Sequence, residues 1–86
     1  MKPLEDNVLD GNAIGGMLIE LFGTEMTTTV GTCGVCGNAA QVAELAVYRS
    51  RLGTVVRCRV CVNVLMVFVE VRGVHCVDLH GLAQLT

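Results

Sequence analysis

Two pairs of cysteines constrain this chain more than any other feature of its sequence. Each pair has the form Cys-x2-Cys, with Cys33 and Cys36 in the first, Cys58 and Cys61 in the second, and 21 residues between the pairs. A tetrahedral Zn²⁺ is bound by four thiolates at about 2.3 Å, and two such knuckles joined by a β-hairpin supply them without strain. The spacing therefore predicts a metal site built from all four cysteines.

The identity of the metal is a separate question, because four thiolates in a tetrahedron suit either Zn²⁺ or a single Fe. We expect zinc, since a chain of 86 residues is near the size at which an apolar core alone becomes marginal. Four thiolates also leave no open position for water, so we expect no catalysis at the metal and no enzyme. A thioredoxin-type redox pair is disfavoured, because that chemistry uses one Cys-x2-Cys beside a βαβ unit.

The expected compartment follows from two further patterns and agrees with a metal site. The first ten residues hold one Lys, three acids and no apolar core region, so no signal peptide is expected. The longest apolar run, residues 60–69, is about half of the roughly 20 residues that a membrane-spanning helix needs. We therefore expect a cytoplasmic protein without a membrane segment, in which paired cysteines bind metals more often than they form disulfides.

Charge is distributed unevenly although the net charge is only −2. Residues 1–44 carry −5 and residues 45–86 carry +3, and the basic half includes Arg49, Arg51, Arg57 and Arg59. These four arginines are candidates for contacts with phosphate or with a partner. The alternative is that they offset the charge of a zinc–thiolate centre, which we favour because the chain is acidic overall and has few aromatic residues to stack on bases.

The N-terminal part of the chain is expected to contain one helix over residues 11–23, after a loose lead-in over residues 1–10. Asp10 is a suitable N-cap, and Gly23 stands where a glycine commonly ends a helix. Between them, apolar residues follow at helical spacing: Ile14, Met17, Leu18 and Leu21.

The rest of the chain has the alternation and turn residues typical of strands. Residues 41–48 and 54–57 are expected to form a hairpin that brings both knuckles to one end, within a metal-binding ribbon over residues 30–62. Residues 62–71 are apolar on both faces, which indicates a central strand covered by the helix on one side and by another element or a second subunit on the other. Arg72 and Gly73 indicate a tight turn inside a second hairpin over residues 62–80, and residues 81–86 suggest a final turn of helix.

Three residues near the C-terminus raise the question of a second site. Cys76, Asp78 and His80 share one face of a regular strand and form a conceivable second ligand set. His75 cannot readily activate Cys76, because neighbours in a strand point to opposite faces. We favour Cys76 as a small buried core residue.

The two knuckles resemble a known architecture. Cys33-Gly-Val-Cys36-Gly37 and Cys58-Arg-Val-Cys61 resemble the knuckles of rubredoxin-like zinc ribbons. Together with the stretches at residues 9–13, 21–23 and 79–82, they resemble a small bacterial zinc-ribbon family, which implies a fold and a metal site but no activity. Such knuckles often have a glycine after the second cysteine, where this chain has Val62, and the second knuckle is therefore expected to hold its sulfurs with fewer amide hydrogen bonds.

Taken together, the sequence predicts a small α+β protein in which an N-terminal helix packs on an antiparallel sheet that contains a four-cysteine zinc ribbon. The favoured function is a non-enzymatic accessory module that binds a protein partner and can self-associate through its valine-rich sheet. An iron electron carrier of the rubredoxin kind is the first alternative, and a nucleic-acid-binding ribbon that uses the arginines is the second.

Overall fold

The computed structural model describes residues 9–86, so the predicted lead-in lies outside the described residues except for its last two positions. The elements follow one another along the chain as β1 (Leu9–Asp10), η2 (Gly11–Ile14), α1 (Gly15–Phe22), β2 (Val30–Cys33), β3 (Ala39–Gln41), η3 (Val42–Glu44), β4 (Ala46–Arg49), β5 (Thr54–Arg57), β6 (Val64–Val71), β7 (Val74–Asp78) and β8 (Leu82–Leu85). Here η denotes a 3-10 helix. The protein is a mixed structure of one short α-helix and two antiparallel sheets.

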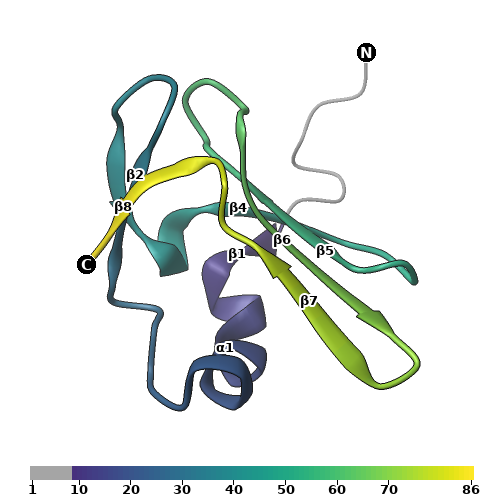
Figure 1. Ribbon diagram of the computed structural model, residues 1–86. Helices are drawn as coiled ribbons and strands as arrows, with labels where there is room; N and C mark the ends of the chain where they lie inside the picture. The colour runs from purple at the N-terminus through teal and green to yellow at the C-terminus, as the bar shows by residue number, and fades with distance from the viewer. Residues whose placement is uncertain (1–8) are drawn as a thin grey trace.

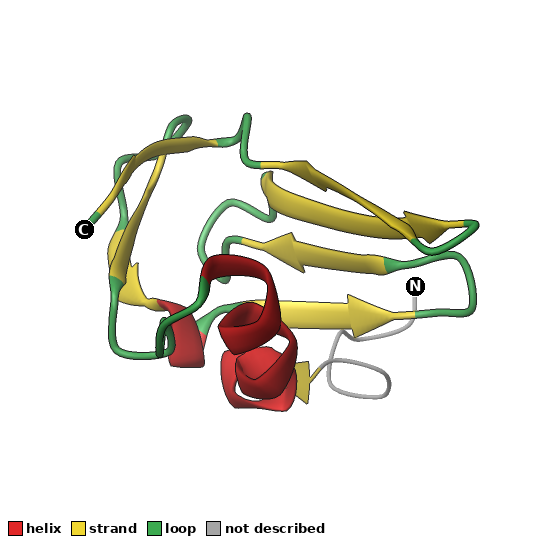
Figure 2. Ribbon diagram, turned by 60° about the horizontal axis from the view of Figure 1, so that its bottom comes forward, coloured by secondary structure: helices red, strands yellow, loops and turns green. Residues whose placement is uncertain are grey.

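The two sheets are built from different parts of the chain (Figure 1). The larger one has the strand order β1-β4-β5-β6-β7, and the smaller one has the order β3-β2-β8. Figure 2 shows α1 against one face of the larger sheet, with the smaller sheet beside it. The core lies between these three parts, and its most buried large side chains include Ile14, Leu18, Val47, Leu65 and Met66.

The predicted helix over residues 11–23 is present in two pieces. Asp10 caps the first piece, η2, because its carboxylate accepts a hydrogen bond from the Asn12 amide at 3.1 Å. α1 then continues to Phe22 and ends at Gly23, whose φ of 75° is the left-handed conformation that favours glycine. Both predicted ends are confirmed, but a single α-helix through residues 11–14 is wrong.

The strand predicted over residues 41–48 is wrong in its middle. The chain leaves β3 at Gln41, forms the 3-10 turn η3, and enters β4 only at Ala46. The reason is tertiary: Val42 is buried in the core and passes so close to Gly11 that a Cβ there would meet the Val42 carbonyl oxygen at 1.7 Å. Alternating polarity in the sequence does not reveal such a close crossing of two backbones.

β6 supplies the long apolar strand that the sequence predicts, beginning at Val64 rather than at Val62. Its pairing with β5 shifts register so that Leu65 has no residue opposite it, which is a β-bulge. Because a bulge turns two successive side chains away from strict alternation, Leu65 and Met66 are both buried. The apolar character on both faces therefore reflects the bulge, in a strand one place from the edge of the sheet.

The C-terminal residues form a strand, and the predicted final turn of helix is wrong. β8 runs antiparallel to β2, with Leu85 opposite Gly31 and Leu82 opposite Cys33. Leu82 and Leu85 pack against the core, as the sequence indicated. β8 thereby completes the smaller sheet beside the first cysteine pair.

Candidate metal centre

The first knuckle is the turn that joins β2 to β3. The Cys33 amide donates to the Asn38 carbonyl at 2.9 Å, and the Gly37 amide donates to the Cys33 carbonyl at 3.1 Å. Gly37 has a φ of 77°, the left-handed conformation that lets the chain turn back after Cys36. This closed turn places both cysteine sulfurs of the pair on its inner side.

The second knuckle joins β5 to β6 and repeats the same bonds. The Cys58 amide donates to the Asn63 carbonyl at 2.9 Å, and the Val62 amide donates to the Cys58 carbonyl at 3.0 Å. Val62 takes the place of Gly37 and has a φ of 67°, which is an outlier for a β-branched residue. The left-handed conformation is therefore unfavourable for Val62 itself and is maintained by the surrounding structure.

The sequence-based predictions did not include the asparagine in each knuckle, although a repeated pattern indicates it. Both knuckles have the form Cys-x-Val-Cys-x-Asn, with Asn38 in the first and Asn63 in the second. Each asparagine accepts the hydrogen bond that closes its knuckle. The Asn63 side chain also lies within 3.8 Å of the Cys33 sulfur, so it links the two knuckles.

The two turns lie side by side at the top of Figure 1, although they belong to different sheets. All four cysteine sulfurs lie within 4.8 Å of one another. The Cys33 and Cys61 sulfurs are 3.5 Å apart, and those of Cys36 and Cys58 are 3.6 Å apart. A tetrahedron with metal–sulfur bonds of about 2.3 Å has sulfur–sulfur edges of about 3.8 Å. The arrangement fits a metal ion bound by four thiolates.

The hairpin that joins the two knuckles is formed by β4 and β5, with its own turn at residues 50–53, so both knuckles lie at its open end as predicted. Each pair in addition occupies the tip of a hairpin of its own, one in the smaller sheet and one in the larger sheet. A bound ion would therefore connect the two sheets.

Backbone amides surround the buried sulfurs. The Cys33 sulfur accepts from the amides of Val35 and Cys36 at 3.4 and 3.5 Å, and the Cys58 sulfur accepts from the Val60 amide at 3.4 Å. These contacts, with the Cys36 amide contributing most, lower the pKa of Cys33 to about 6. Amides and oriented dipoles of this kind favour the thiolate form that a metal requires.

The Cys36 sulfur, at the surface, has its pKa shifted in the opposite direction. The Asn38 amide lowers the pKa of Cys36, but burial and the neighbouring thiols outweigh it and raise that pKa to about 12. Several thiolates cannot share so small a space without a compensating cation, because like charges disfavour each other's ionised form. The electrostatics are therefore those of a site that a cation completes.

The four candidate arginines do not form one cluster. Arg57 precedes the second knuckle and Arg59 lies within it, whereas Arg49 and Arg51 lie at the other end of β5, about 10 Å from Arg57 along the strand. Arg57 donates to the Val62 carbonyl at 2.9 Å, and Arg59 donates to the Glu44 carbonyl at 2.7 Å.

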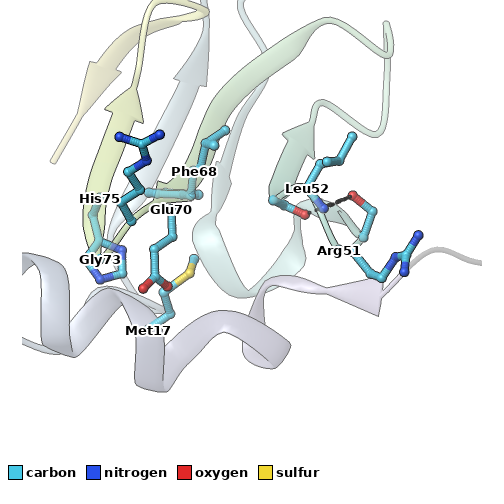
Figure 3. A pocket seen from close by; sticks show the side chains of 11 residues that line it. Met17, Arg51, Leu52, Phe68, Glu70, Gly73 and His75 are labelled. Carbon is cyan, nitrogen blue, oxygen red and sulfur yellow. Dashed lines mark hydrogen bonds between the residues drawn. The ribbon is translucent and has the colours of Figure 1, made fainter.

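Three of the arginines, Arg49, Arg57 and Arg59, donate hydrogen bonds to backbone carbonyls of the chain. Arg49 bonds the Ala13 carbonyl at 3.3 Å, and Arg57 lies over the Tyr48 ring with 5.7 Å to its centroid. Arg51 belongs to the turn after β4, where it lines a pocket of about 320 Å³ together with Met17, Glu70 and His75 (Figure 3). The separation and these internal bonds favour a structural role for the arginines near the knuckle over a continuous phosphate-binding surface.

The conceivable second ligand set is not assembled. Cys76 and Asp78 lie on β7 with exposed side chains, and Asp78 accepts from the His80 amide at 2.8 Å. Within residues 9–86, the only group arranged to hold a metal is the set of four knuckle cysteines. The prediction that Cys76 is buried is wrong: its side chain is exposed on β7, an edge strand that pairs with β6 alone among the described residues.

The fold and the site together define a small mixed α and β domain with a four-cysteine site able to hold a metal ion. The chain belongs to the family of unknown function DUF6510, whose model matches residues 5–86. Neither a curated protein nor a solved structure matches the chain. None of the helices in the described part of the chain is long and apolar enough to cross a membrane.

Proposed function

We propose that the protein is a non-enzymatic zinc-binding module of the zinc-ribbon kind, in which the metal holds the fold together. The observation that carries this proposal is the convergence of four cysteine sulfurs, within 4.8 Å of one another, from the tips of hairpins in two different sheets. Four thiolates complete a tetrahedron, so the ion has no position for a substrate or a water nucleophile.

A structural role agrees with the size of the core. The two sheets share a small apolar core, and the two knuckles lie at its edge, where Cys33 and Cys58 are themselves almost fully buried. Binding of structural zinc contributes about 10–16 kcal/mol in zinc-finger peptides, whereas small domains are stable by about 5–15 kcal/mol in total. Loss of the ion is therefore expected to remove most of the stability of this domain.

The test compares two cysteine substitutions in protein loaded with zinc. Cys58→Ser is expected to lose zinc and to unfold, because it removes a buried ligand of the ion that would connect the two sheets. Cys76→Ser is the matched control, since Cys76 is exposed and is not a ligand, and it is expected to keep one zinc per chain and the wild-type circular dichroism. A folded, metal-free Cys58→Ser protein with wild-type stability would show that the metal is not structural.

An iron electron carrier is the second candidate, favoured by one observation. Cys36 and Cys61 lie at the surface, so an electron reaching the centre from a partner would have a short path through protein. Four thiolates suit iron as well as zinc. The decisive measurement is the metal content and visible absorption of protein from cells supplied with both metals. One zinc and no colour supports the structural module, whereas one iron with charge-transfer bands that bleach on reduction supports electron transfer.

A further inference from the structure

Strand β7 forms an open edge of the larger sheet. It pairs with β6 on one side only, and all five of its residues are exposed. Val74 is 62% exposed and Val77 is 41% exposed. Figure 1 shows the strand at the outer side of the sheet, beside β6. An edge strand with exposed valines is a template for pairing with another strand.

The turn before β7 determines which of its backbone groups face outward. Arg72 and Gly73 form a two-residue turn with φ values of 53° and 79°, so Val71 and Val74 are the hydrogen-bonded pair that closes it. Bonded and non-bonded pairs then alternate along the strand. The amide and carbonyl groups of His75 and Val77 consequently point away from β6, toward the open edge.

A second copy of the chain matches these outward groups in one antiparallel register. When Cys76 lies opposite Cys76 of the second copy, His75 of each chain lies opposite Val77 of the other. The outward groups of His75 and Val77 then form bonded pairs on both sides of a two-fold axis. Such a register gives one continuous sheet across two chains.

Charge and side-chain placement suit this register. Asp78 of each chain lies opposite Val74 of the other, and the two Asp78 residues are about 14 Å apart, at the opposite ends of the paired segment. Arg72 lies two residues before Val74, in the turn, so each Asp78 lies near the arginine-bearing turn of the other chain. His75 lies beside Glu70 on the face that carries α1 (Figure 3), which places Cys76 on the opposite face.

We propose that β7 is a self-association surface through which two copies pair edge to edge, with Cys76 on the two-fold axis. This inference goes beyond the proposed zinc-binding role, and names a second copy of the chain as the partner. Since the paired segment has only five residues, the interface belongs to the small class that forms weak, concentration-dependent complexes.

The first test measures association by analytical ultracentrifugation of zinc-loaded protein. Wild type is expected to show a reversible monomer–dimer equilibrium. Val74→Asp places a carboxylate opposite Asp78 at both ends, and is expected to weaken the dimer at least about fivefold, as two unfavourable cross-strand pairs require. Val74→Lys changes the same exposed position with the opposite charge, and is expected to bind at least as tightly as wild type.

A second variant tests the hydrogen bonds rather than the charges. His75→Pro removes an outward amide that makes no bond to β6, so a proline is tolerated in the monomer while the dimer is lost. Zinc content and circular dichroism are measured for every variant. If they stay at wild-type values, a change in association reports on the β7 surface and not on the metal site.

The third test is chemical cross-linking at the proposed axis. Oxidation by diamide takes two protons and two electrons from a pair of Cys76 thiols, forms one disulfide between chains and reduces the diamide. Opposed residues in a non-bonded antiparallel pair are about 4.5 Å apart at Cα, within the range of a disulfide. A covalent dimer is expected in wild type and not in Cys76→Ser.

The results separate the two proposals. A zinc-bound wild-type chain that stays monomeric at high concentration, or a dimer that neither Val74→Asp nor His75→Pro weakens, overturns the pairing of β7 and leaves the zinc proposal intact. A chain that contains no zinc but dimerises through β7 as expected overturns the zinc proposal and leaves the pairing of β7 intact.

Discussion

A methyl group at Gly81 has no room in this structure. A Cβ there would meet the Val64 carbonyl oxygen at 1.8 Å and the Leu65 Cα at 2.8 Å, and both are backbone atoms. On the other side, the Gly81 carbonyl accepts the Gly34 amide at 2.9 Å. Gly81 therefore lies between the first knuckle and the strand that leaves the second, close to the metal centre.

The cost of Gly81→Ala follows from these distances. A carbon and a carbonyl oxygen normally stay about 3.3 Å apart, so one of the two backbone segments must move by about 1.5 Å. Overpacking of this kind costs up to about 3 kcal/mol, and loss of the bond from Gly34 adds about 1 kcal/mol. We expect a total loss of about 3–4 kcal/mol, which for a domain of this size lowers Tm by roughly 12–30 °C.

Gly16→Ala is the matched control, because it adds the same methyl group in the exposed first turn of α1, where nothing lies within 4 Å of the new Cβ. Alanine is the better helix former, so this variant is expected to gain about 0.5–1 kcal/mol and to melt a few degrees higher. Thermal melts of both zinc-loaded variants are followed by far-ultraviolet circular dichroism, since the chain has no tryptophan. Equal melting temperatures for Gly81→Ala and wild type would refute the close approach.

Three further predictions concern the knuckles and the sheet. Val62→Gly is expected to be about 1 kcal/mol more stable than Val62→Ala in urea titrations, because both remove the two methyl groups of valine and only alanine keeps the Cβ that makes the left-handed conformation unfavourable; equal stability would contradict the strain. The Tyr48 hydroxyl is buried with no hydrogen-bond partner among the described residues, so Tyr48→Phe is expected to be neutral or stabilising by up to about 1 kcal/mol in the same assay. Because protons compete with zinc for thiolates, zinc affinity is expected to fall as the pH falls. Below pH 6, where Cys33 with its pKa lowered to about 6 also takes a proton, the affinity is expected to fall by about a further factor of ten for each pH unit. A pH-independent affinity in chelator competition would contradict a thiolate site.

Local signals in the sequence were reliable where one or two residues decide the conformation. Asp10 caps a helix, Gly23 ends one, and the Arg72-Gly73 pair makes the predicted tight turn. In each case the backbone conformation depends on the chemistry of that residue and not on its distant neighbours. The second knuckle was also expected to have fewer amide contacts to sulfur, and the Cys58 sulfur accepts one such bond where the Cys33 sulfur accepts two.

The errors share a different cause. Residues 41–48 alternate as a strand does, but Gly11 and Val42 approach so closely that the chain turns there instead. Residues 81–86 become a strand because β2 offers them an unpaired edge. Cys76 is exposed because β7 lies at the edge of the sheet, where its only strand partner among residues 9–86 is β6. Each outcome depends on a contact between residues far apart in the chain, which local periodicity does not encode.

The sequence by itself determined which residues make up the candidate metal centre, since two Cys-x2-Cys pairs supply four thiolates in any fold that brings them together. It also determined the caps and tight turns, which are set by short-range backbone preferences. Only the tertiary structure decided that the two pairs occupy hairpin tips in separate sheets, so that a bound ion would join the sheets, and that β7 is left as an open edge. The physical reason is that strand pairing joins segments far apart in the chain. Which segments pair depends on the burial of the whole core rather than on any one stretch of the sequence.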